Sequence, residues 1–93
     1  MPKTRKLHHS KYGLIKIHYG FNIFSKEYFT TALDPHLDDE YGIIFSVGTF
    51  TTLVPHPEFP DLREWDNFTM ARLWHNLDVP EKDIQLLLKG FFV

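Results

Sequence analysis

The chain has 93 residues, of which 43% are hydrophobic and 24% charged, and its formal net charge is −2 with neutral histidines. This length suits one domain around one hydrophobic core, and the ordinary composition excludes a chain that is disordered throughout, so we expect residues 1–93 to form a single domain. The chain has no cysteine, which excludes a disulfide framework, a thiolate zinc site and a cysteine nucleophile and is compatible with a cytoplasmic location.

Charge is distributed unevenly along the sequence. The first twenty residues contain five basic residues and no acidic one, whereas residues 27–66 contain nine acidic residues against Arg63 alone. The basic residues at the start are not followed by the apolar run of a signal peptide. We expect residues 1–10 to form a flexible basic segment.

Alternating apolar and polar residues predict a small antiparallel sheet of three to four strands over residues about 12–54. In residues 12–24, Ile15, Ile17 and Tyr19 would share one face of a strand, and the residues between them would lie on the other face. This pattern is typical of a strand with one buried face.

The rest of the sheet is predicted from β-branched and aromatic residues. Residues 26–33 favour a strand, although Ser25 could instead cap a short helix there. Residues 34–40 are acidic and rich in turn-forming residues, so we expect an exposed loop. Residues 41–54 give the strongest β signal, which Gly48 could divide into two strands.

A connector containing Pro55, Pro57 and Pro60 separates the sheet from a predicted helix over residues about 66–77. Asp66 can cap this helix. Four apolar residues recur at the spacing of one buried helical face: Met70, Leu73, Trp74 and Leu77.

A second helix is predicted over residues about 80–89. Asp78 and Glu81 fit a capping box at its start, and Gly90 fits a C-terminal stop. The predicted fold class is therefore α+β, with a small antiparallel sheet packed by two C-terminal helices.

The sequence contains no recognisable catalytic, metal-binding or nucleotide-binding motif. The six histidines show no metal-ligand spacing, and surface or edge positions are their plainest interpretation. The acidic loop lacks the glycine and the final glutamate of an EF-hand, Ser46 has no nucleophile elbow, and there is no glycine-rich phosphate loop. We expect no catalytic residue, metal or cofactor, with an enzyme or accessory subunit of unrecognised type as an alternative.

The favoured hypothesis is a non-catalytic protein-binding module, such as a small inhibitor or an immunity-type protein. Its partner would be a protein with a basic surface, for example a nucleic-acid enzyme. The acidic middle of the chain could instead serve only to keep a phenylalanine-rich domain soluble. The candidate partner-binding residues are three acids for steering and three aromatic anchors: Asp38, Asp39, Glu40, Tyr41, Phe59 and Trp65.

The alternative hypothesis is a small nucleic-acid-binding protein that uses its basic N-terminal segment. Tyr12 or Tyr19 could stack on bases. The candidate phosphate-binding residues are Lys3, Arg5, Lys6 and Lys11. No stretch approaches the roughly 18 apolar residues that span a membrane. An uncovered sheet edge would also permit a homodimer.

Overall fold

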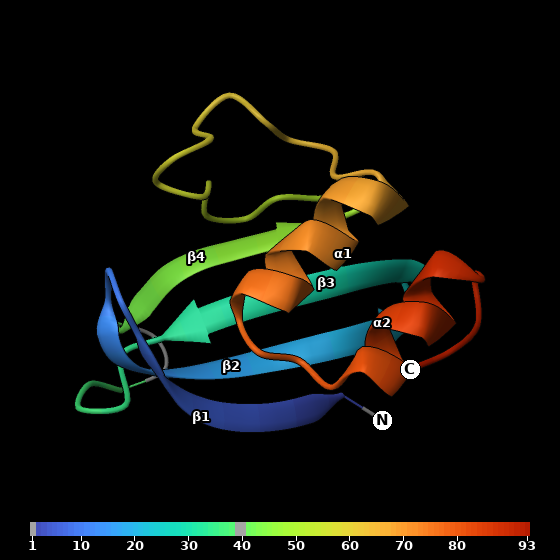
Figure 1. Cartoon of the computed structure of the whole chain (residues 1–93). Helices are drawn as coiled ribbons and strands as arrows, with labels where there is room; N and C mark the ends of the chain where they lie inside the picture. The colour runs from blue at the N-terminus through green and yellow to red at the C-terminus, as the bar shows by residue number, and fades with distance from the viewer. Residues whose placement is uncertain (1, 39–40) are drawn as a thin grey trace.

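The computed structural model describes residues 2–38 and 41–93 and contains a sheet followed by two helices (Figure 1). The elements are β1 (Lys3–His9), β2 (Gly13–Asn22), β3 (Glu27–Leu33), β4 (Ile43–Gly48), α1 (Asn67–Asn76) and α2 (Glu81–Leu88). This arrangement confirms the predicted α+β class, including the strand expected over residues 26–33. Neither helix in the described part of the chain is long and apolar enough to cross a membrane.

The four strands pair antiparallel in chain order, β1-β2-β3-β4. In their register Ile17 lies opposite Ala32, which lies opposite Phe45, and all three side chains are fully buried. The strong β signal over residues 41–54 gives a strand only as far as Gly48, after which the chain turns back and Val54 forms an isolated antiparallel bridge with Ser46 of β4. Figure 1 shows α1 and α2 side by side on one face of the sheet.

The core lies between that face and the two helices. The predicted apolar face of α1 is buried, and Trp74 at its centre donates its indole N–H to Thr30 Oγ1 of β3 at 2.7 Å. Asp66 caps α1 as predicted, because its carboxylate accepts the backbone N–H of Thr69 at 2.7 Å.

The N-terminal segment is a strand, so the expectation of a flexible basic segment over residues 1–10 was wrong. Lys3 pairs with Tyr19 of β2, which places its side chain on the face covered by the helices. There the Lys3 ammonium donates to Asp83 Oδ1 at 2.7 Å, and the Tyr19 hydroxyl donates to Asp83 Oδ2 at 2.8 Å. Asp83 is only 1% exposed, and a buried carboxylate needs such partners to remain charged.

The charge states of Lys3, Tyr19 and Asp83 favour the docked position of β1. Burial by itself raises the pKa of the Asp83 carboxyl, but the hydrogen bonds from Lys3 and Tyr19 outweigh it and hold that pKa below its ordinary value. Burial, and then the bond to Asp83, raise the pKa of Tyr19 well above its ordinary value. At pH values above the ordinary carboxyl pKa, the charged Asp83 therefore stabilises the folded chain. This contribution is lost as the pH falls through the lowered pKa of Asp83.

The start of α2 also differs from its prediction. Pro80 occupies the N-cap position without a side-chain hydrogen bond, so the Asp78 capping box was wrong. Asp78 instead adopts a left-handed conformation, with φ of 56°, at the end of α1. Its N–H bonds to the carbonyl of His75, and the next N–H, of Val79, bonds to that of Trp74, which is a Schellman closure of α1. Aspartate tolerates this conformation better than most residues.

Replacing Lys3 by Met tests the docking of β1. The substitution keeps the apolar stem but removes one partner of a buried carboxylate, so the free energy of unfolding should fall by about 1 to 2 kcal/mol, a value discounted for the 41% exposure of the Lys3 side chain. The matched control is Lys6→Met, on the exposed face of the same strand, which should change stability little. Urea unfolding measures both, and equal losses would contradict the docked arrangement.

Candidate functional site

The candidate site is a pocket of about 290 Å³ formed by three parts of the chain that are distant in sequence. Its walls are the turn between β1 and β2, the connector between β4 and α1, and one side of α1, with Phe45 of β4 at the base. The lining residues are His9, Tyr12, Phe45, His56, Glu58, Phe59, Leu62, Trp65, Thr69, Arg72, Leu73, Asn76 and Leu77.

Aromatic rings form a continuous series along the pocket, which we call the aromatic wall: His9, Tyr12, Phe45, His56, Phe59 and Trp65. His9 stacks on Tyr12 with ring centroids 4.8 Å apart, and Tyr12 lies 6.5 Å from Phe45. The His56 ring lies 4.6 Å from Phe45. It also lies 5.3 Å from Phe59 and 5.8 Å from Trp65, so His56 joins the sheet to the connector.

His56 is buried within this wall, and its environment defines its protonation state. Burial lowers the pKa of His56 below its ordinary value, so the ring is neutral at pH 7. The backbone N–H of Glu58 donates to His56 Nδ1 at 3.1 Å. The neutral ring therefore carries its proton on Nε2.

The connector is irregular, but backbone hydrogen bonds hold it. Its prolines cannot donate to a sheet, and short turns replace regular pairing. The N–H of Phe59 bonds to the carbonyl of His56 at 3.0 Å, and that of Leu62 to the carbonyl of Phe59 at 3.1 Å. The N–H of Trp65 bonds to the carbonyl of Gly48 at 3.1 Å, which ties the end of the connector to the end of β4.

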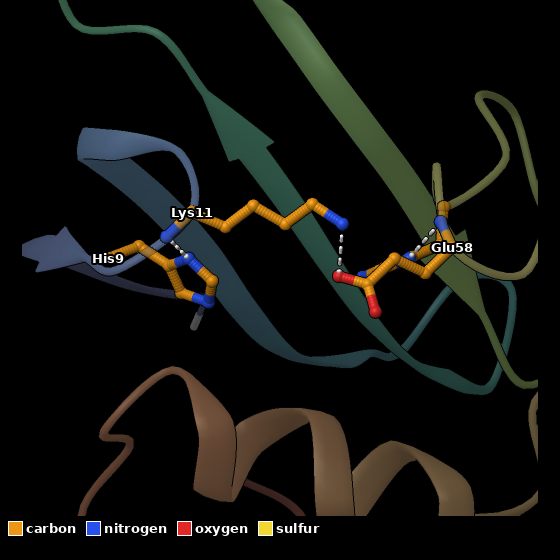
Figure 2. Close-up of polar contacts among 4 residues, drawn as sticks. His9, Lys11 and Glu58 are labelled. Atoms are coloured by element: carbon orange, nitrogen blue, oxygen red, sulfur yellow. Dashed lines mark hydrogen bonds and ion pairs between the residues drawn. The ribbon is translucent and has the colours of Figure 1, made fainter.

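An ion pair joins the β1–β2 turn to the connector (Figure 2). Lys11 Nζ lies 3.0 Å from Glu58 Oε1, and the backbone N–H of Lys11 donates to His9 Nδ1 at 3.0 Å. The hydrogen bond from Lys11 lowers the pKa of Glu58, and the reverse effect raises the pKa of Lys11. Both groups are therefore charged at neutral pH, and each neutralises the other.

Two buried polar atoms of the aromatic wall have no hydrogen-bond partner among the residues the structure describes: the Tyr12 hydroxyl and Trp65 Nε1. Burial raises the pKa of Tyr12, so its hydroxyl keeps its proton and can donate. A buried donor without a partner costs about 1 to 3 kcal/mol. Arg5 Nε of β1 is a third such atom, but Arg5 does not line the pocket.

The structure does not gather the predicted partner-binding residues on one surface. Asp38 and Tyr41 are exposed in the loop between β3 and β4, while Asp39 and Glu40 lie outside the described residues. Figure 1 shows this loop at one end of the sheet, separated from the connector that lies beyond β4. Of the connector residues, Phe59 is 51% exposed and accessible to a partner.

Trp65 is 1% exposed, so its predicted role as an exposed anchor was wrong. The reason is that the connector folds back onto the sheet, which places the indole edge-on to Phe59 with ring centroids 6.0 Å apart. Trp65 contributes to the pocket wall and the core rather than to the outer surface.

The basic residues proposed to bind phosphate are also separated. Lys3 and Lys11 each pair with a carboxylate, on opposite ends of the β1–β2 hairpin. Arg5 shares the helix-facing side of β1 with Lys3, and Lys6 is exposed on the other side. The segment is therefore not a free basic arm that could wrap a nucleic-acid strand.

Sequence reasoning missed His9, His56 and Arg72 as site residues, and it named Tyr12 only as a residue that could stack on bases. The interpretation of the histidines as surface or edge residues was wrong for His56, which is buried. The one available signal was the density of aromatic residues in a connector whose prolines exclude regular structure. That signal could have pointed to a packed connector, but not to the residues it packs against.

The chemistry of the pocket is that of a binding site with aromatic faces and hydrogen-bond donors. Within residues 2–38 and 41–93, no group of three or more histidine, aspartate or glutamate side chains is placed to hold a metal ion. No family model, curated protein or solved structure matches the chain. The function is therefore inferred from the geometry of the chain itself.

The buried His56 ring predicts a specific pH dependence. The unfolded chain takes up a proton near pH 6.5 whereas the folded ring does so only at lower pH, so the free energy of unfolding should decrease as the pH falls from about 7 to about 5. A ring-proton NMR titration should place the His56 midpoint below 6.5. His56→Asn keeps an acceptor for the Glu58 N–H and should lose part of the pH dependence.

The control for this prediction is His8→Asn, at an exposed position of β1, which should keep the pH dependence of the unmodified chain. An unchanged slope in His56→Asn, or a His56 midpoint at or above 6.5, would contradict the assignment of a buried neutral ring.

Proposed function

We propose that this protein is a non-catalytic binding module, of the kind used by small inhibitors and immunity proteins, and that its connector contacts a basic protein surface. The observation that carries the proposal is the exposed ring of Phe59 within an acidic segment. We call this the acidic aromatic surface: Glu58, Phe59, Asp61 and Glu64, all of which are exposed. A partner such as a nucleic-acid enzyme would offer the complementary charge.

The acidic aromatic surface combines steering with an apolar anchor. Because Glu58 is already paired with Lys11, the steering charge belongs to Asp61 and Glu64, which form no ion pair within the described chain. Carboxylates near an apolar anchor accelerate encounter with a basic partner, and the anchor then slows dissociation. The proposal keeps the acidic, aromatic-flanked surface expected from the sequence but centres it on Phe59.

The fixed backbone of the connector favours this role. The His56 ring packs on Phe45, and the turn hydrogen bonds hold Phe59 relative to the sheet. A segment that is ordered before binding loses little conformational entropy when the complex forms. An irregular segment held in this way can therefore serve as a recognition surface without regular secondary structure.

A random peptide library displayed on phage tests the proposal with a defined probe. Peptides selected on the immobilised chain should carry an excess of lysine and arginine, and their affinity should fall as salt rises. Phe59→Ala should weaken the selected peptides by about tenfold or more, mainly through faster dissociation. The double change Asp61→Asn and Glu64→Gln should mainly slow association.

Two matched controls address other exposed groups. Phe24→Ala removes a ring that is 92% exposed in the turn between β2 and β3, and Asp38→Asn removes an exposed charge in the loop between β3 and β4. Both should leave peptide binding unchanged. Selected peptides without basic residues, or equal losses from Phe24→Ala and Phe59→Ala, would overturn the proposal.

A further inference from the structure

We propose that the pocket behind the acidic aromatic surface is a binding site for a small aromatic carboxylate. This inference goes beyond the proposed function, because it concerns a small molecule held inside the pocket rather than a protein bound on the outer surface. It is based on the shape of the pocket, its unpaired donors and its charge.

The size and the walls of the pocket suit one planar ring system. A volume of about 290 Å³ lies just below the range of about 300 to 1,000 Å³ that is typical of pockets for drug-sized ligands. The residues of the aromatic wall line the pocket together with Leu73 of α1 and Leu77 at the C-cap of that helix. A flat ring can stack or pack edge-on against such walls.

The donors of Tyr12 and Trp65 indicate that the ring carries a hydrogen-bond acceptor. An indole N–H can only donate, so a group that satisfies Trp65 must be an acceptor. The second tryptophan shows the contrast, because the indole N–H of Trp74 is paired with Thr30 at 2.7 Å. Native proteins leave few buried polar atoms unpaired, and here two of them belong to residues that line the same pocket.

The charges around the pocket favour a carboxylate as that acceptor. Two charged residues line it, Glu58 and Arg72. Glu58 is neutralised by Lys11, as Figure 2 shows, so it would not repel an anion. Arg72 forms no ion pair among the described residues and supplies a positive charge from α1. Arginine pairs well with carboxylates because its donors match both oxygens.

The two tryptophans make the test direct. In ¹H–¹⁵N spectra of the labelled full chain, the indole N–H signals of Trp65 and Trp74 can be told apart with the variant Trp65→Phe. Benzoate and indole-3-carboxylate should shift the Trp65 signal in a saturable way and leave the Trp74 signal in place. Acetate, which has the acceptor but no ring, and indole, which has the ring but no acceptor, should bind at least tenfold more weakly.

Variants then separate binding in the pocket from other effects. Tyr12→Phe removes the unpaired hydroxyl at nearly constant shape, so it should weaken benzoate binding about three- to tenfold while leaving the folded chain at least as stable. Arg72→Gln should weaken benzoate but not benzamide, which has a neutral acceptor. Tyr41→Phe, at an exposed position in the loop between β3 and β4, is the matched control and should change nothing.

The outcomes are distinguishable from those of the peptide experiment. A Trp65 signal that does not move at millimolar probe, as expected if no ligand reaches this donor, would overturn the inference. Equal shifts of Trp65 and Trp74, or equal binding of acetate and benzoate, would do the same. Peptide binding should be unaffected by Tyr12→Phe, so either proposal can fail while the other stands.

Discussion

The buried ring of His56 is the contact on which the candidate site depends. It packs on Phe45 of the sheet and on Phe59 and Trp65 of the connector, and its Nδ1 accepts the N–H of Glu58. A proline-containing segment cannot be held by a regular hydrogen-bond ladder, so side-chain packing positions it together with the turn hydrogen bonds. The same ring thereby fixes one wall of the pocket and presents Phe59 to solvent.

The buried carboxylate of Asp83 helps to position β1, as His56 helps to position the connector. Its bonds to Lys3 and Tyr19 link α2 to β1 and β2, in addition to the antiparallel pairing with β2 that makes β1 the fourth strand of the sheet. The turn that follows β1 carries His9 and Tyr12 to the pocket, where Lys11 pairs with Glu58. Asp83, with Lys3 and Tyr19, thus holds one end of the β1–β2 hairpin, and the aromatic wall holds the other end.

Local patterns in the sequence predicted most of the fold, whereas the site depended on tertiary contacts. The buried side of β2 and the cap at Asp66 follow from residues within a few positions of each other, and both were predicted correctly. The strand at Lys3 was missed because the carboxylate that accepts its charge is 80 residues away. The burial of His56 and Trp65 was missed because no periodicity shows that an irregular connector folds back on the sheet. Asp78 was assigned to the wrong helix because one aspartate can serve either end of a tight junction.

The connector is a fixed wall and not a mobile loop. The steady-state ¹H–¹⁵N heteronuclear NOE of its backbone amides measures this on the picosecond to nanosecond timescale, with the amides of β2 and β3 as internal references. In a fixed connector, the amides of His56, Glu58, Phe59 and Trp65 should have values as high as those of the two strands. Values well below those of the strands, and similar to those of a chain end, would contradict it.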